Sequence, residues 1–264
     1  MERIKQALDK ARQEREIRNT GNLTPLTGAR AGTEEVVYDQ TQEIKLDYNV
    51  LREHRILTGL EPGAFSDAYN LLRTQVLQRF KENNWNVLAV TSPGRGAGKT
   101  LTAINLAISI AREVDYTVLL VDANLRHPWM LEHFGLEKRA GLSDYLLHDT
   151  PISELLVKSS RVEHLMLLPG GEPISNSAEM LNSPKMVQLV KDMKSSYHSR
   201  IIIFDLPPVL TSADALAFSP YVDAALLVVE EGVTEKQDLE RAVELLNATN
   251  IVGTVLNKAE PTRN

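Results

Sequence analysis

The stretch TSPGRGAGKT, residues 91–100, separates an apolar run typical of a β-strand (NVLAVT, 86–91) from a run with helical periodicity (LTAINLAISIAREV, 101–114). In a glycine-rich turn before a helix, small residues let backbone N–H groups converge on phosphate oxygens, and the helix N-terminus adds partial positive charge. Lys99 can then reach the outer phosphates, and Thr100 can bind Mg²⁺. The stretch therefore predicts a site for a nucleoside triphosphate.

The loop departs from the usual pattern G-x-x-x-x-G-K-[ST] at its first glycine. Pro93 stands where that glycine is expected, and Gly94 follows one position later. A Gly-Lys-Thr triplet can occur in any glycine-rich turn, but such a turn would leave the flanking strand, the helix and two acidic strand ends unexplained. The departure narrows the choice among families with phosphate loops.

Strand-like and helix-like segments alternate after residue 64. We expect a helix at 65–80 and strands near 86–91, 117–122, 164–168, 200–205, 222–229 and 251–256, with helices between them. Most of these strands are apolar throughout, which is typical of a sheet that is covered on both faces. The pattern predicts an α/β fold with a mostly parallel sheet flanked by helices, and a ligand at the carboxyl ends of the strands.

Two of the predicted strands end in an aspartate: Asp122 in VLLVD and Asp205 in IIIFD. A single aspartate at such a place is often a helix cap or a turn former, but two of them in a chain with a Gly-Lys-Thr loop favour a functional pair. Mg²⁺ bound to phosphates uses few protein ligands and keeps several waters. We therefore expect Thr100, Asp122 and Asp205 to form the metal site.

The composition excludes several kinds of site. The 264 residues include no cysteine, which excludes disulfides, thiol catalysis and cysteine-bound metal clusters. The six histidines are scattered without ligand-like spacing, and the net charge of -6 argues against nonspecific binding of nucleic acid. No stretch has the roughly 18 to 20 apolar residues of a membrane helix. We expect a cytoplasmic protein.

Residues 1–60 are predicted to form an N-terminal extension, and residues 61–264 the nucleotide-binding domain. Residues 1–20 show apolar residues at helical spacing among six Lys/Arg and four Asp/Glu. Residues 20–45 have the Gly, Pro and Thr punctuation of a flexible linker. The first 20 residues fit a docking helix for a partner or a membrane surface, and a solvated terminus, equally well.

Five motifs together resemble one known family. They are TSPGRGAGKT, VDANLRHP at 121–128, GGEPISNSAEMLNSP at 170–184, FDLPP at 204–208 and VLNK at 255–258. The set resembles the bacterial tyrosine kinases of polysaccharide export, the BY-kinases, which are a branch of the MinD/ParA-like P-loop ATPases. The resemblance is closest to the stand-alone autokinases of exopolysaccharide loci. It implies a protein-tyrosine autokinase that uses ATP and Mg²⁺ and regulates capsular or exopolysaccharide synthesis and export.

The resemblance also implies roles for individual residues. Lys99, Asp122 and Asp205 would be catalytic, with Asp122 in the second Walker-type motif and Asp205 in Walker B. Arg126 matches the arginine that follows the second motif. Asn257 matches an asparagine that reads the adenine edge, although a cap at a strand end explains it equally well. The nucleotide would be bound by Gly94, Arg95, Gly96, Ala97, Gly98, Lys99, Thr100, Leu101, Arg126 and Asn257.

Three features depart from the family pattern. The second motif usually reads Asp-x-Asp, whereas this chain has Asn124 at the second position. A motif of ring assembly, Glu-x-x-Arg-x-x-Arg, is represented by Asp67, Asn70 and Arg73, and no tyrosine follows Tyr221. The competing hypothesis is a MinD/ParA-like nucleotide switch or scaffold without kinase activity.

Such switches carry a signature lysine early in the loop, where this chain has Gly94 followed by Arg95. The expected partner is a membrane polysaccharide chain-length or export protein, which would hold this protein at the inner face of the membrane. We also expect self-association and no nucleic acid partner. Docking through 65–80 would use an apolar stripe that packing onto the protein's own sheet explains as well; its residues are Phe65, Tyr69, Leu72, Val76 and Phe80.

Overall fold

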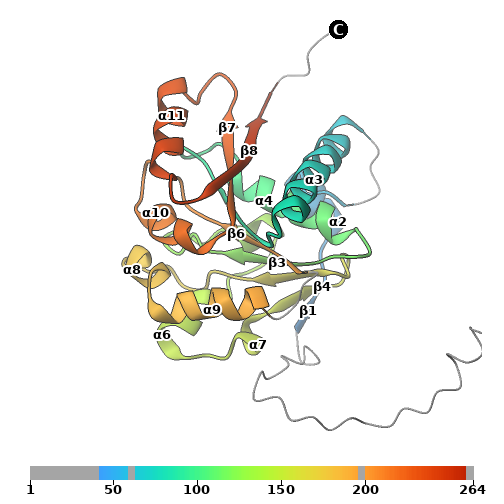
Figure 1. The fold of residues 1–264 in the computed structure, drawn as a ribbon. Coiled ribbons are helices and arrows are strands. Elements are labelled where there is room, and N and C mark those ends of the chain that lie inside the picture. The colour runs from blue at the N-terminus through green and yellow to red at the C-terminus, as the bar shows by residue number, and fades with distance from the viewer. Residues whose placement is uncertain (1–41, 59–62, 196–199, 260–264) are drawn as a thin grey trace, which may run out of the picture. The chain divides into compact units, whose positions relative to one another are not determined.

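The computed structural model describes residues 42–58, 63–195 and 200–259 (Figure 1). The predicted amphipathic helix at 1–20 and nearly all of the predicted linker at 20–45 lie outside the described residues. Within the described part of the chain, no helix is both long enough and apolar enough to cross a membrane.

Eight strands of the described residues form one sheet in the order β1-β4-β5-β3-β6-β2-β7-β8. Neighbouring strands run parallel except β4 and β5. The strands are β1 Gln42–Ile44, β2 Val87–Thr91, β3 Thr117–Asp122, β4 Val157–Ser159, β5 Leu165–Leu168, β6 Arg200–Asp205, β7 Ala224–Glu230 and β8 Asn250–Asn257. The mostly parallel α/β sheet and the six predicted strands are confirmed.

Helices cover both faces of this sheet (Figure 1). Leu88 and Val90 of β2 are buried with the helices of one face, and Val87 and Ala89 with those of the other, because side chains alternate along a strand. The first face carries α2 Tyr48–Glu53, α3 Ala64–Asn83, α4 Lys99–Ala111 and α5 Met130–His133. The second carries α6 Leu142–His148, α7 Ile152–Leu155, α8 Ser177–Leu181, α9 Pro184–Ser195, α10 Asp214–Phe218 and α11 Lys236–Leu245, and a 3₁₀ helix spans Ser219–Tyr221.

Residues 42–58 belong to the sheet domain, which differs from the predicted boundary near residue 60. Strand β1 pairs with β4, and Leu51, Ile56 and Leu57 are buried in the hydrophobic core. The backbone N–H of Leu57 donates to Asn105 Oδ1 at 2.8 Å. The prediction of a linker is therefore wrong for the described residues 42–45, which contribute a strand and a buried side chain.

Strand β8 is not covered on both faces, contrary to expectation. It ends the sheet beside β7, and Leu256 is 58% exposed. Apolar runs predict a strand but do not distinguish a central strand from an edge strand.

The apolar stripe of α3 packs onto the protein's own core. Tyr69, Val76 and Phe80 are buried in the cluster that contains α4. Arg73 donates to the Ser109 carbonyl oxygen of α4 at 3.1 Å and forms an ion pair with Glu113 at 2.9 Å. The alternative of inward packing is confirmed for these three residues. Arg73, a position of the ring-assembly motif, makes contacts within the chain.

Candidate active site

The phosphate loop has the backbone that its glycines predict. The loop follows β2 and leads into α4, whose first residue is Lys99. Gly96 has φ +83° and Gly98 has φ +87°, a left-handed conformation that side chains rarely adopt. A Cβ on Gly98 would lie 2.1 Å from Asn257 Nδ2. Gly98 therefore serves both the turn and the close approach of β8.

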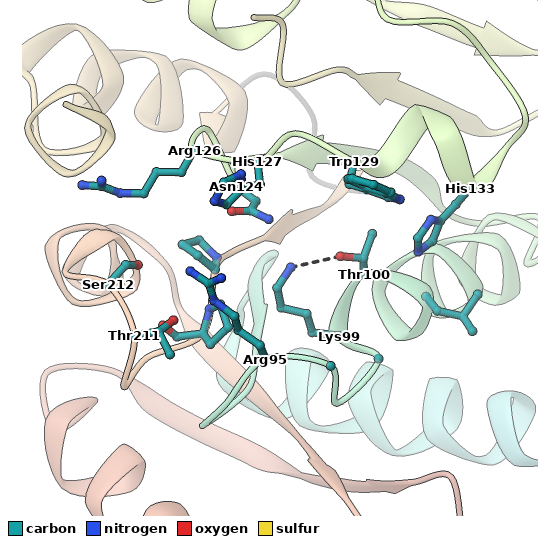
Figure 2. A pocket seen from close by; sticks show the side chains of 15 residues that line it. Arg95, Lys99, Thr100, Asn124, Arg126, His127, Trp129, His133, Thr211 and Ser212 are labelled. Atoms are coloured by element: carbon teal, nitrogen blue, oxygen red, sulfur yellow. Dashed lines mark hydrogen bonds between the residues drawn. The ribbon is translucent and has the colours of Figure 1, made fainter. Parts of the chain in front are cut away.

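Lys99, Thr100 and Asp205 form a compact polar cluster at the start of α4. The Lys99 ammonium lies 3.0 Å from Asp205 Oδ1 and donates to Thr100 Oγ1 at 3.0 Å, a bond drawn in Figure 2. Thr100 Oγ1 donates to Asp205 Oδ2 at 2.7 Å. Asp205 is almost fully buried, so the ammonium neutralises a carboxylate that would otherwise be costly to bury. A polyphosphate and a cation can replace these contacts with equivalent charges.

A cavity of about 770 Å³ lies above this cluster, a volume typical of small-molecule sites. Its walls are the loop with the start of α4 and the segments that follow β3 and β6 (Figure 2). The lining residues are Arg95, Gly96, Gly98, Lys99, Thr100, Leu101, Asn124, Arg126, His127, Trp129, His133, Pro207, Pro208, Thr211 and Ser212. The carboxyl ends of three parallel strands thus form the site, as the sequence predicts.

Asp122 is buried beside Asp205, its register partner on the adjacent strand. Its Oδ2 accepts from the backbone N–H groups of Trp129 at 2.9 Å and Met130 at 3.0 Å, and its Oδ1 from Asn124 N–H at 3.2 Å. Burial raises the pKa of Asp122 to about 7, the Asp205 charge raises it too, and these N–H donors oppose the rise. Asp122 holds the turn after β3 in place and does not line the cavity itself.

Asn124 has a side-chain amide oxygen that is free to bind a metal ion. Its Oδ1 is buried and has no hydrogen-bond partner among the described residues, and the side chain lines the cavity. Amide, hydroxyl and carboxylate oxygens are suitable Mg²⁺ ligands, and Mg²⁺ on phosphates needs few of them from the protein. The oxygens of Asn124, Thr100 and Asp205 therefore fit a Mg²⁺ ion bound together with phosphates.

Of two further predicted residues, Arg126 lines the cavity and Asn257 does not. The Nε of Arg126 lies 3.4 Å from Oδ1 of Asp214, a fully buried carboxylate that also accepts from the Ser177 hydroxyl. The Nδ2 of Asn257 donates to the Ala97 carbonyl oxygen at 2.8 Å, which ties the end of β8 to the phosphate loop.

Comparison with known proteins places this site in a family. A family model described as an AAA domain matches residues 85–258. The chain is 33% identical over 208 residues to the tyrosine-protein kinase YwqD of Bacillus subtilis (strain 168), an alignment that covers 78% of this chain and 86% of that protein.

The chain belongs to the family of bacterial tyrosine-protein kinases. The kinase domain of the Escherichia coli tyrosine kinase ETK superposes on this chain with a TM-score of 0.70 and 25% identity, and the alignment covers 86% of this chain and 91% of the ETK domain. The MinC:MinD cell division complex of Aquifex aeolicus has a TM-score of 0.54 with 28% identity, and covers 66% and 69%. Both structures share the fold of this chain, and the tyrosine kinase domain matches it with the higher TM-score and the larger coverage.

The cavity of this chain is also lined by residues that were not predicted from the sequence. His127, Trp129 and His133 follow β3, and Pro207, Pro208, Thr211 and Ser212 follow β6; all of them line the cavity. Their place in the sequence, just after two predicted strands, could have indicated them, because residues that follow parallel strands form the ligand site of such a sheet. The predicted Lys99, Thr100 and Asp205 are brought together. Lys99 and Thr100 line the cavity, whereas Asp122, Asp205 and Asn257 are not among its lining residues.

Proposed function

We propose that this tyrosine kinase transfers the γ-phosphoryl group of ATP to tyrosine hydroxyls, on copies of itself or on another protein, and thereby regulates capsular or exopolysaccharide synthesis and export. The observation that carries the proposal is that Lys99 and Thr100 line a cavity of nucleotide size and both contact the buried Asp205 carboxylate. Family membership supports tyrosine as the acceptor.

The loop and Lys99 would stabilise the charge of the transferred group. Phosphoryl transfer proceeds through a loose transition state with charge on the phosphoryl oxygens, so positioning and electrostatic stabilisation dominate. Thr100 and Asp205 would hold Mg²⁺, which neutralises phosphate charge when bound. Asn124 takes the place of Asp122 in the predicted metal site, because the Asp122 oxygens already accept from backbone N–H groups and the Asn124 oxygen is open. Lys99 would leave its partner Asp205 and approach the outer phosphates, and Arg95 and Arg126 add positive charge at the cavity wall.

We propose Asp122 as the general base that accepts the proton of the acceptor tyrosine hydroxyl. A phenol has a pKa near 10, so a carboxylate need only orient it and accept the proton late in the reaction. The raised pKa of Asp122, about 7, brings its proton affinity close to neutral pH, where a general base works best. Its oxygens are held by backbone N–H groups, so this role requires the Asn124 N–H, which makes the longest of these bonds at 3.2 Å, to release Asp122 Oδ1.

Asn257 remains our candidate for reading the adenine edge, through the side-chain oxygen that its bond to Ala97 leaves open. The partner in this proposal is a membrane chain-length or export protein, bound through residues 1–20. The charged amphipathic pattern of those residues supports it. Docking there would place the kinase at the inner face of the membrane.

The proposal is tested by incubating the purified chain with ATP and Mg²⁺ and measuring phosphotyrosine by antibody and by mass spectrometry. The wild type should form phosphotyrosine, and Lys99→Met should form none and bind ATP at least about tenfold more weakly, because it lacks the charge that faces the phosphates. Circular dichroism establishes that Lys99→Met is folded. ATP binding without phosphotyrosine in the wild type would instead support the nucleotide switch.

A further inference from the structure

Trp129 is a large aromatic side chain that is not packed into the core. The residue is 54% exposed and lines the cavity. Figure 2 shows its indole on the wall that faces Lys99 and Thr100, with His133 beside it. Tryptophan is highly buried on average, because its large apolar surface is costly to expose. A half-exposed indole at the wall of a ligand cavity therefore offers an apolar face to a ligand.

The backbone of Trp129 is fixed even though its side chain is open. Its N–H donates to Asp122 Oδ2 at 2.9 Å, and the neighbouring Met130, which donates to the same oxygen, is fully buried. The indole thus projects from an anchored turn and is not carried on a free loop. An anchored aromatic ring loses little conformational freedom on binding, which favours its use as a recognition surface.

The position of Trp129 indicates whether its indole can contact the base of the nucleotide or the acceptor. Lys99 would reach the outer phosphates, and Thr100 would help to hold the Mg²⁺ that accompanies them. The wall opposite these two residues therefore faces the reacting end of the nucleotide, which the ribose and the inner phosphates separate from the base. The group that must approach the outer phosphate from this side is the acceptor.

The surroundings of Trp129 also suit an uncharged ring. Burial lowers the pKa of His133, so this imidazole is neutral near pH 7, whereas Arg95 and Lys99 place positive charge on the loop side. Anionic phosphates are attracted to the charged wall. Trp129 and His133 give their part of the cavity an uncharged, aromatic surface, whereas the charged residue of the same segment, Arg126, lies beside the buried Asp214 carboxylate.

We propose that Trp129 binds the aromatic ring of the acceptor tyrosine and directs its hydroxyl toward the outer phosphate, which favours tyrosine over serine and threonine. The inference rests on the proposed tyrosine kinase activity and names the residue that contacts its second substrate. Offset or edge-to-face contact between an indole and a phenol would supply this recognition.

The test compares Trp129→Ala and Trp129→Phe with the wild type, using a random glutamate–tyrosine copolymer as acceptor. We expect Trp129→Ala to raise the KM for the copolymer about tenfold, the loss that an aromatic contact of this size implies, while the KM for ATP stays within about twofold. Trp129→Phe should recover most of the copolymer affinity. Val114→Ala, an exposed apolar change just beyond the C-terminal end of α4, is the matched control and should leave both constants unchanged.

A second measurement keeps the proposal testable if Trp129→Ala folds poorly. The chain has two tryptophans, so Trp85→Phe leaves Trp129 as the only indole, and its emission should change when the copolymer is added to the ADP-bound protein. Trp129→Phe, which retains Trp85, should show no change.

Each contrary outcome has a distinct meaning. A wild type that phosphorylates the copolymer, together with an unchanged copolymer KM in Trp129→Ala, would overturn the role of Trp129 alone. A large rise in the KM for ATP would show that Trp129 binds the base and would overturn it as well. A wild type that forms no phosphotyrosine would overturn the proposed function and this inference together.

Discussion

Asn124 carries a buried amide oxygen without a partner among the described residues, at the wall of the nucleotide cavity. An Asn124→Asp change adds a negative charge near Asp122 and Asp205. We expect this variant to need less Mg²⁺ for half-maximal phosphorylation, because a carboxylate binds the cation more strongly than an amide. Mg²⁺ titration of both forms at saturating ATP tests this, and identical titration curves would show that Asn124 does not bind the cation.

Asp122 gives a second residue-scale prediction, in the stability of the nucleotide-free protein. Its pKa is about 7 in the folded chain, well above that of an unfolded aspartate. From about pH 4 to about pH 7 the folded state therefore binds more protons than the unfolded state, and this group lowers the free energy of unfolding by up to about 1.4 kcal/mol per pH unit as pH rises.

An Asp122→Asn variant loses this contribution and keeps an oxygen for the backbone N–H groups. Urea unfolding at several pH values should show that the stability of the wild type relative to Asp122→Asn falls as pH rises toward 7 and levels off above it. A difference that does not change with pH would mean that Asp122 is not a buried, shifted carboxyl group.

The residues that sequence could predict at the site are those fixed by motif spacing. Lys99 and Thr100 begin a helix after a glycine turn, and Asp205 ends a strand, so their meeting follows from the local pattern and the parallel sheet. The position of Trp129 depends on how the turn after β3 folds around the Asp122 carboxylate. No local pattern specifies that path.

At the scale of elements, the loop and β8 depend on each other through Gly98. A Gly98→Ala change would strain a backbone with φ +87° and force its Cβ against Asn257. We expect it to weaken ADP binding at least about tenfold and to cost about 1–3 kcal/mol of stability. Gly253→Ala in β8 is the control, because nothing lies within 4 Å of its Cβ position and Gly253 is not a predicted site residue. Calorimetry with ADP should show wild-type affinity for Gly253→Ala; equal loss in both variants would mean that the effect is not specific to the loop.

The element pattern was predicted where hydrophobic runs are long and missed where they are short. The six predicted strands are present, but β1 and β4 are only three residues each, and two residues of β1 are exposed. Such segments become strands because a neighbouring edge supplies hydrogen-bond partners, which is a tertiary effect. The same limit explains why the edge position of β8 could not be predicted.

At the scale of the whole molecule, catalysis and docking are predicted to be separable. The described residues that form the cavity all lie between Arg95 and Ser212, whereas the docking helix is proposed at 1–20. Deleting residues 1–20 should leave copolymer phosphorylation by the purified kinase within about twofold of wild type and reduce its recovery with membranes from cells. Unchanged membrane recovery and normal polymer export would identify the segment as a tail.

Tyrosine kinase activity is tested most directly by following the γ-phosphate during a single incubation with ATP and Mg²⁺. We expect phosphotyrosine to appear together with ADP in the wild type, and neither to appear in Lys99→Met. ADP and free phosphate without phosphotyrosine in the wild type would overturn the kinase proposal, because the same loop and cavity would then serve a nucleotide switch.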